Sequence, residues 1–533
     1  MRRFLRVFCA LLFCLVPVWA DRKPLRIAVV SDIHVQDTTI VRSMDAEVHS
    51  TRLFNENYVA ALAAFDDIAR RGIKDVIITG DLTDNGQKMN VELIGRVLRR
   101  YTSIYGMHFF LMTGNHDPSR PFAESNANTE LQPWGYKEIH KEWASFGFMP
   151  QKEYLYWATP FSSYSYQNYR YSQALRQSDW SHRTYRYPAQ NHSSATYRPD
   201  IHDGSYLVEP VKDVWLLAID ASVYHPLKVE NDSILTFENA KGGYNEVFDV
   251  KPYLLPWIKK VAKEARLRHK TLIAFSHYPM ADYNSGAAQY IKDIAVPGRF
   301  DMFRFPSDKS SELLADAGIT FHLGGHIHLN DDTEFISAKG NRLRNIQIPS
   351  TAGYAPAYKI LTVADNSPIS VSTVPLDSVA GFNVYFSRYR AEYDSLSQKD
   401  KSHLWDERIL SSTNYREFCK WHLRELLRLR FLPADFLPVA SQQFISMSAT
   451  QLYQRYGLPA VGPADWNGFD MLFDFYKLRM AGALALSDIP PSRLKQYEML
   501  ISKALGKSSP KDDLDKFFIG LCHIMSLRLK NIN

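Results

Sequence analysis

The chain has 533 residues, which is too long for one typical hydrophobic core, so we expect a large domain and a smaller one. Hydrophobic residues make up 45% and charged residues 23%, a balance that excludes a largely disordered chain. The net charge of +6 is modest, and it falls by three if the first 20 residues are removed, so no nucleic-acid partner is expected.

The first 20 residues have the order of a secretory signal peptide. Arg2, Arg3 and Arg6 precede an apolar run over residues 7–18, and small residues lead up to Ala20. The run is shorter than the roughly 20 residues that span a bilayer, so an uncleaved membrane anchor is the weaker alternative. We therefore expect cleavage after Ala20, no transmembrane anchor after processing, and a periplasmic or secreted protein.

Apolar runs alternate with helical patterns from Leu25 onward, which is typical of strands joined by crossover helices. One helix is indicated by apolar positions between Tyr58 and Ala69, and it ends at Gly72. Catalytic groups in open α/β sheets gather outside the carboxyl ends of the strands, so we expect a site at that edge. The runs predicted as strands are residues 26–31, 75–79, 109–113, 214–219, 271–275 and 319–323.

Residues 118–206 interrupt this pattern with an insertion that is dense in Tyr, Trp, Ser and Arg. The insertion follows directly on the GNHD motif at residues 114–117, so it is expected over or beside any site there. Long loops inside compact domains are often functional lids. Alternatively, the insertion is a folded surface element whose aromatic side chains pack on one another.

Beyond residue 380 the strand patterns give way to helical ones. One apolar face recurs at helical spacing from Leu514 through Phe518 to Met525, so residues 381–533 are predicted to form a helical domain with buried stripes. Cys419 and Cys522 are the only cysteines beyond the leader, which excludes a cysteine-based zinc site. A disulfide and two buried free thiols are both compatible with this pair.

Five short motifs, DIH, GD, GNHD, SHYP and GHIH, each follow a predicted strand. A single histidine is more often structural than a ligand, but all five motifs occur in order at strand ends, which predicts a two-metal site. The mixture of nitrogen and oxygen donors suits Mn, Fe or Zn and is poor for Ca or Mg alone. Asp81 is the candidate bridge, because a carboxylate has two oxygens. The candidate ligands are Asp32, His34, Asp81, Asn115, His277, His326 and His328.

The motifs, read as DIH, GDLTDNG, GNHD, SHYP and GGHIH, resemble those of the calcineurin-like metallophosphoesterases over roughly residues 25–375. The resemblance implies an α/β fold of four layers, a β-sandwich flanked by helices, within residues 21–380, followed here by the all-α region. It also implies two divalent or trivalent transition-metal ions. One ion would be held by Asp32, His34, Asp81 and His328, and the other by Asp81, Asn115, His277 and His326.

The resemblance further implies direct attack on phosphorus by a hydroxide formed on the ions, which lie roughly 3.5–4 Å apart in such sites. His116 is then placed to protonate the leaving alkoxide or to stabilise its charge. Asp84 resembles the family carboxylate that orients this histidine, and its negative charge would keep the imidazole protonated. The alternative for Asp84 is a turn residue before Asn85 and Gly86.

Differences between these motifs and those of known subfamilies narrow the class of substrate that we expect. Asp84 stands where purple acid phosphatases carry a tyrosine, and Asn85 and Thr113 stand where protein serine/threonine phosphatases carry arginines. The leader, the helical tail and GHIHLNDDTEF look more like acid sphingomyelinase-like secreted phosphodiesterases. We expect hydrolysis of a small phosphomonoester or phosphodiester, or of a phospholipid-type headgroup, outside the cytoplasm. The alternative is a non-catalytic metal-dependent binding protein for a phosphorylated ligand.

Overall fold

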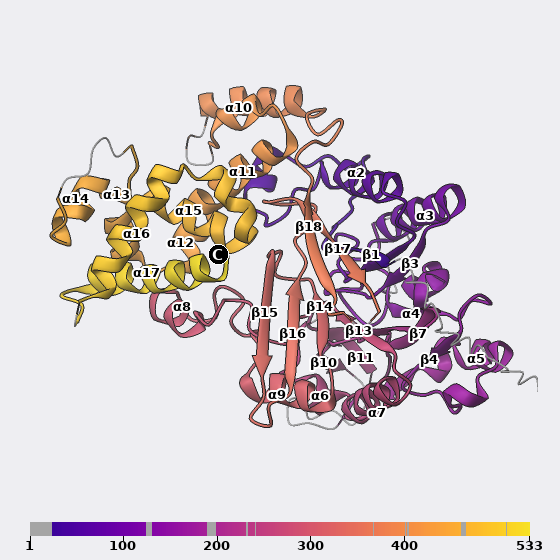
Figure 1. Cartoon of the computed structure of the whole chain (residues 1–533). Helices are drawn as coiled ribbons and strands as arrows, with labels where there is room; N and C mark the ends of the chain where they lie inside the picture. The colour runs from indigo at the N-terminus through magenta and orange to yellow at the C-terminus, as the bar shows by residue number, and fades with distance from the viewer. Residues whose placement is uncertain are drawn as a thin grey trace, which may run out of the picture.

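The computed structural model describes residues 24–123, 131–188, 199–230, 233–239, 241–365, 367–399, 401, 404–459, 465–507 and 509–532. The predicted signal peptide, residues 1–20, lies outside these residues. Within them, two mixed sheets pack on each other, and the C-terminal helices gather to one side of both sheets (Figure 1). None of the described helices is both long enough and apolar enough to cross a membrane.

The first sheet has five strands. The three strands on one side of it, β1, β2 and β3, run parallel. β1 and β2 are almost entirely buried, as expected for parallel strands covered on both faces. β17 pairs antiparallel with β1, so a late segment of the chain completes this sheet. In spatial order the strands are β18 (Ser370–Pro375), β17 (Ala357–Val363), β1 (Leu25–Val30), β2 (Asp75–Ile78) and β3 (His108–Leu111).

The second sheet has seven strands, of which β8, β13, β14 and β16 run parallel. Antiparallel strands close both of its edges. In spatial order the strands are β15 (Asp331–Ile336), β16 (Arg342–Gln347), β14 (Phe321–Gly324), β13 (Thr271–Ser276), β8 (Val214–Ala218), β7 (Tyr206–Val211) and β4 (Tyr156–Ala158). All six strands predicted from apolar runs are therefore present, each within two residues of its expected bounds.

Helices cover the outer faces of the two sheets, which gives the predicted four layers (Figure 1). Residues of both sheets and of these helices share one hydrophobic core. The predicted helix is α2, which buries Ala61, Phe65 and Ile68 and ends just before Gly72. The covering helices are α2 (Asn57–Arg70), α3 (Lys88–Tyr105), α7 (Leu254–Leu267) and α9 (Asp308–Ala317).

The described part of the insertion packs against the edge of the seven-stranded sheet. It contributes β4 to that sheet, together with helices α4 (Tyr136–Glu142) and α5 (Tyr171–Gln177). Its aromatic rings contact one another and Trp215 of β8; the ring centroids of Tyr156 and Trp215 are 5.8 Å apart. This arrangement agrees with the alternative in which the aromatic side chains pack together.

The C-terminal region is helical and has a hydrophobic core of its own, which Met44, Tyr283 and Leu329 of the α/β part also join. Cys419 and Cys522 are both buried free thiols. The helices are α10 (Phe386–Lys399), α11 (Tyr415–Leu426), α12 (Leu432–Asp435), α13 (Pro438–Ser446), α14 (Ala449–Arg455), α15 (Gly468–Ala481), α16 (Pro491–Leu505) and α17 (Asp513–Ile532).

The buried stripe of α17 generates a stability prediction. Phe518 is 1% exposed and contacts the rings of Phe444 and Tyr456. Phe518→Ala should lower the free energy of unfolding by about 3–5 kcal/mol, because it removes apolar contacts and leaves a cavity. Urea unfolding followed by circular dichroism measures this change. Val439, which is 71% exposed, supplies the control: Val439→Ala should stay within about 0.5 kcal/mol of wild type, and an equally small change for Phe518→Ala would contradict the prediction.

Candidate metal centre

The predicted ligands follow the carboxyl ends of five strands, three from one sheet and two from the other. Because the sheets pack with these ends at one rim, segments up to almost 300 residues apart in the chain converge there. Asp32 and His34 follow β1, Asp81 follows β2, Asn115 follows β3, His277 follows β13, and His326 and His328 follow β14.

Five of these residues have a left-handed backbone, which is rare for side chains other than glycine and clusters at functional sites. The turns are held by backbone hydrogen bonds: the Asp32 amide donates to the Gly80 carbonyl at 3.1 Å, and the His34 amide donates to the Asp81 carbonyl at 2.9 Å. The left-handed turns allow side chains two positions apart to face the same point. The φ angles are 49° at Asp32, 50° at His34, 50° at Asp81, 71° at His326 and 57° at His328.

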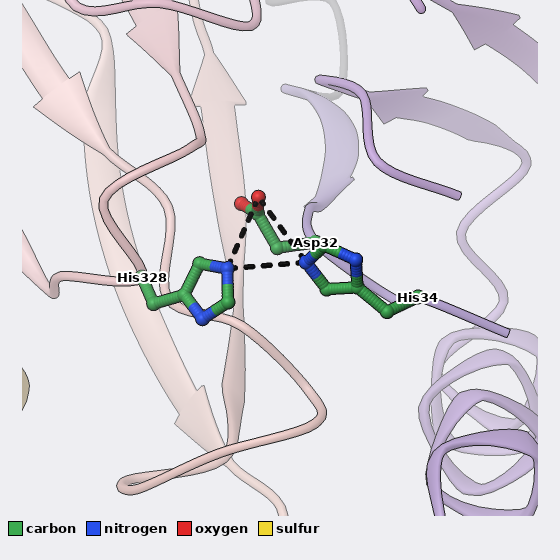
Figure 2. A group of neighbouring side chains, drawn as sticks. All are labelled: Asp32, His34 and His328. Atoms are coloured by element: carbon green, nitrogen blue, oxygen red, sulfur yellow. Dashed lines mark hydrogen bonds and ion pairs between the residues drawn. The ribbon is translucent and has the colours of Figure 1, made fainter. Parts of the chain in front are cut away.

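Asp32, His34 and His328 form the first group of donors (Figure 2). The Nε2 atoms of His34 and His328 are 3.2 Å apart, and they lie 4.0 and 3.4 Å from Asp32 Oδ1. Two ligands that each lie about 2.1 Å from one ion are about 3.0–3.4 Å apart at ordinary coordination angles. Two of the three spacings, 3.2 and 3.4 Å, match this range, and the third, 4.0 Å, is longer. The buried N and O donors suit a transition-metal ion.

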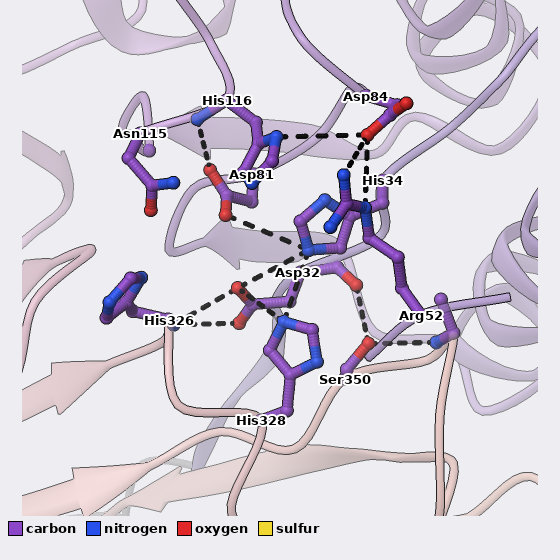
Figure 3. Close-up of polar contacts among 12 residues, drawn as sticks. Asp32, His34, Arg52, Asp81, Asp84, Asn115, His116, His326, His328 and Ser350 are labelled. Atoms are coloured by element: carbon purple, nitrogen blue, oxygen red, sulfur yellow. Dashed lines mark hydrogen bonds and ion pairs between the residues drawn. The ribbon is translucent and has the colours of Figure 1, made fainter. Parts of the chain in front are cut away.

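Asp81, His277 and His326 form the second group. His277 Nε2 lies 3.2 Å from Asp81 Oδ2 and 3.0 Å from Asn115 Oδ1. Asp81 Oδ2 is also 3.7 Å from His34 Nε2, so one carboxylate oxygen borders both groups (Figure 3). This position of a single oxygen is compatible with a bridging ligand, and the bridging role of Asp81 stays a prediction.

Hydrogen bonds on the far side of the rings orient the second group. His277 Nδ1 lies 3.1 Å from the Thr79 carbonyl and donates to it, which leaves Nε2 for an ion. His326 Nε2 lies 2.8 Å from Asp301 Oδ2, which leaves Nδ1. Ligating histidines commonly hold their second nitrogen in this way. Asp301 lies in a segment without a motif, so sequence reasoning gave no signal for it.

The electrostatics favour an ionised carboxylate at the junction of the two groups. Burial acts to raise the pKa of Asp81, but His277 and His116 hold it well below its usual value. Burial, together with Arg52, lowers the pKa of His34 well below its usual value, so this ring is neutral. Burial acts to lower the pKa of His277, but the charge of Asp81 raises it to about 9. Metals bind the ionised carboxylate and the neutral ring, so an ion at His277 must displace a proton.

His116 lies beside the first group, and its ring centroid is 5.0 Å from that of His34. Its Nδ1 is 3.0 Å from Asn85 Oδ1 but 3.8 Å from Asp84 Oδ1, because Asp84 is bound by the guanidinium of Arg52. Burial lowers the pKa of His116 to about 4; Arg52 adds to the effect, while Asp81 and Asp84 oppose it. The ring is therefore neutral at neutral pH, which differs from the expectation that Asp84 keeps it protonated. The charge of Arg52 offsets that of Asp84.

A model of the calcineurin-like phosphoesterase family matches residues 25–330. The chain belongs to this family. It is thus a metallophosphoesterase, an enzyme that hydrolyses phosphoric esters with the help of metal ions, and the two donor groups are candidate sites for a pair of ions. The match covers every motif from Asp32 to His328.

Two solved structures are similar at low identity. A dimetal phosphatase from Danio rerio is 12% identical, with a TM-score of 0.36, over 66% of this chain and 95% of that chain. GAP50, the anchor in the inner membrane complex of Plasmodium, is also 12% identical, with a TM-score of 0.29, over 66% of this chain and 85% of that chain. No curated protein matches significantly.

A cavity of about 430 Å³ opens from the candidate ligands of this phosphoesterase. Within the described part of the chain, no residue of the insertion lines this cavity, although the insertion was expected over or beside the site. Residues of the C-terminal helices form part of the cavity wall instead, and no sequence motif predicted this. Besides candidate ligands, the lining includes Arg52, Arg299, Phe300, Arg304, Arg430, Phe431, Tyr476 and Arg479.

A larger cavity of about 900 Å³ lies at the amino ends of the parallel strands, away from every predicted site residue.

Close backbone approach at Gly80 generates a prediction for metal binding. A Cβ at Gly80 would lie 2.6 Å from His277 Nδ1 and 2.9 Å from the backbone nitrogen of Gly114, so Gly80→Ala must displace a ligand. We expect the affinity for at least one ion to fall roughly tenfold or more. Metal analysis after dialysis against a competing chelator measures the loss.

Gly106→Ala is the matched control for this change. Gly106 shares the positive φ, but its added Cβ would meet nothing within 4 Å. This variant should lose about 1–2 kcal/mol of stability from backbone strain and keep its metals. Equal metal content in the two variants would show that crowding at Gly80 has no role.

Proposed function

We propose that the protein hydrolyses a small phosphomonoester or phosphodiester, or a phospholipid-type headgroup, outside the cytoplasm. The observation that supports the proposal is the pair of adjoining donor groups, with Asp81 Oδ2 3.2 Å from His277 Nε2 of one group and 3.7 Å from His34 Nε2 of the other. The location rests on the leader pattern of residues 1–20. We assign Asp32, His34, Asp81 and His328 to one ion, and Asp81, Asn115, His277 and His326 to the other; Mn, Fe and Zn all suit these donors.

We also propose a division of the chain near residue 380. β18 ends at Pro375 and α10 begins at Phe386, so residues 21–380 would form the metallophosphoesterase domain with the insertion at 118–206. Residues 381–533 would form the helical domain, whose hydrophobic core is distinct from that of the sheets. A relation to secreted acid sphingomyelinase-like phosphodiesterases is consistent with this order of domains.

The chemistry divides between the ions and the side chains around them. When bound, two ions would activate a water and polarise the phosphoryl oxygens. The carboxylate of Asp81 is fixed for its task, since Oδ1 accepts from the His116 amide at 2.8 Å. Arg52 lines the cavity and binds Asp84, so its guanidinium lies beside the candidate metal ligands. Arg52 does not belong to any of the five motifs.

His116 is the group we assign to the leaving oxygen. It lines the cavity, and Asn85 accepts from its Nδ1–H, so Nε2 is the nitrogen available to a substrate. A neutral ring must first gain a proton at Nε2 before it can donate one, and the anionic phosphate of a substrate favours that gain. Asp84 remains our proposed partner of His116, acting through its charge at 3.8 Å.

The test of the proposed function uses the mature protein loaded with Mn, Zn or Fe. We expect hydrolysis of 4-nitrophenyl phosphate or bis(4-nitrophenyl) phosphate, and a loss of roughly a hundredfold or more in kcat/KM for Asp81→Asn, because both ions lose a charged ligand. Asp394→Asn, on the exposed face of α10, should change nothing. Tight phosphate binding without any product would instead support the non-catalytic alternative.

The role of His116 predicts a dependence on the leaving group. His116→Gln should lower kcat for an alkyl phosphate by roughly a hundredfold or more, because an alkoxide needs a proton to leave. For 4-nitrophenyl phosphate the loss should be below about tenfold, since nitrophenolate leaves without one. Steady-state kinetics with both esters measure the difference. Equal losses for both would assign His116 to the ions or to substrate binding rather than to proton transfer.

A further inference from the structure

The wall of the cavity that faces the metal-binding rim is cationic and aromatic. Arg430 and Phe431 end the helical turn η5 (Leu427–Phe431) between α11 and α12, whereas Tyr476 and Arg479 lie on α15. Arg299 joins them from the loop before α9. None of these residues belongs to a metal-binding motif, so the wall needs an explanation of its own.

Positive charge on this wall exceeds the negative charge that faces it. Arg52 is bound by Asp84, and Arg304 pairs with Asp301 at 2.9 Å. The remaining lining arginines, at 299, 430 and 479, face one carboxylate, that of Asp435. Burial raises the pKa of Asp435, and these three arginines oppose the rise. Burial lowers the pKa of Arg430; the charge of Asp435 opposes this shift, and repulsion from Arg52 and Arg299 adds to it.

Arg479 shows most directly that a counter-charge is missing. Its side chain is buried, with 7% exposed, and its Nε finds no hydrogen-bond partner among the described residues. Its Nη1 makes a weak contact of 3.9 Å with the sulfur of Met480. The guanidinium lies over the ring of Phe300, 5.2 Å from its centroid. A buried cation without a paired anion is unfavourable, so an anion brought by a ligand would stabilise this arrangement.

Aromatic rings lie between the arginines and provide an apolar surface. The rings of Phe431 and Tyr476 stack with centroids 5.0 Å apart, and Phe300 continues the stack at 6.1 Å. The cavity volume of about 430 Å³ falls within the range of small-molecule sites. A phosphoryl group at the ions would therefore leave room for a leaving group that extends along this wall.

We propose that the wall formed by Arg299, Arg430 and Arg479 binds a second anionic group on the substrate. The substrate class is a phosphoric ester whose leaving group carries another phosphate or a carboxylate, joined by an apolar segment that lies against Phe431. The inference rests on the proposed function and narrows its substrate. Soluble bisphosphates and phosphorylated lipid headgroups share this chemistry.

The test compares two esters that differ only in the second anion, butane-1,4-diol monophosphate and butane-1,4-diol bisphosphate, with the metal-loaded full chain. We expect kcat/KM to be roughly ten- to hundredfold higher for the bisphosphate, mostly through a lower KM, as charge-assisted hydrogen bonds of this kind provide. Arg430→Gln and Arg299→Gln should each reduce that ratio about tenfold. Both side chains keep solvent-exposed surface at the cavity, although Arg430 is partly enclosed, and neither belongs to a hydrophobic core, so the variants should fold.

Arg428→Gln is the matched control, because Arg428 lies two residues before Arg430, pairs with Glu425 and does not line the cavity. It should leave the ratio unchanged. A wild-type ratio within about twofold, which two equivalent phosphates alone would give, overturns the inference. So does a ratio that neither Arg430→Gln nor Arg299→Gln changes relative to Arg428→Gln.

Two further experiments distinguish a lipid from a soluble source of the second anion, and failure of this inference from failure of the proposed function. Phosphatidylinositol 4-phosphate in phosphatidylcholine vesicles tests a lipid headgroup, and its hydrolysis with the same Arg430 dependence supports the inference for that source. If no ester at all is hydrolysed, the proposed function fails, and butane-1,4-bisphosphonate then tests the wall by calorimetry. Binding that is tighter than that of butylphosphonate and weakens in Arg430→Gln supports the second-anion site; equal binding of the two phosphonates overturns it.

Discussion

The buried carboxylate of Asp81 is the group on which the rest of the centre depends. It is 2% exposed, and burial of an ionised carboxylate is unfavourable unless donors or cations surround it. The fold supplies them from both sheets: the His116 amide and His34 approach from one, and His277 from the other. One side chain thereby joins the two halves of the sandwich at the rim where the strands end.

The backbone around this carboxylate is held in conformations that the side chains alone would not favour. Left-handed residues cost free energy and persist where their surroundings fix them. Here the fixing contacts come from distant segments. Ser350 donates to the Asp32 carbonyl at 2.6 Å (Figure 3), and the side-chain amide of Asn57 donates to the His34 carbonyl. The geometry of the centre is therefore a property of the packed sandwich and not of the motifs alone.

The helical C-terminal region contributes side chains to the cavity at the site. Its helices form a core of their own, yet Arg430, Phe431, Tyr476 and Arg479 reach the cavity that opens from the ligands. The candidate metal ligands follow the ends of the sheet strands, whereas the C-terminal helices supply much of the far wall of the cavity. This arrangement separates the groups suited to activating a phosphoryl group from those suited to selecting what is attached to it.

Much of this protein was determined by its sequence, because the relevant signals are local. Buried parallel strands read as continuous apolar runs, amphipathic helices show their 3.6-residue period, and each candidate ligand sits directly after its own strand. Six strands of the two sheets were not predicted individually: β4, β7, β15, β16, β17 and β18. All but β16 pair only antiparallel or lie at a sheet edge, where the apolar pattern is weaker. The candidate ligands could be predicted because each one follows a predicted strand, and only the meeting of those strand ends had to be assumed.

Tertiary structure alone decided which other residues surround the ligands. Asp301 behind His326, Arg52 beside Asp84 and Arg479 in the cavity wall occupy segments without motifs, and their roles arise from contacts across tens to hundreds of residues. It also placed the described part of the aromatic insertion against the sheet edge and the helical tail at the cavity, whereas proximity to GNHD had indicated the insertion over or beside the site. Local pattern fixes what a segment forms, but packing of distant segments fixes what that segment faces.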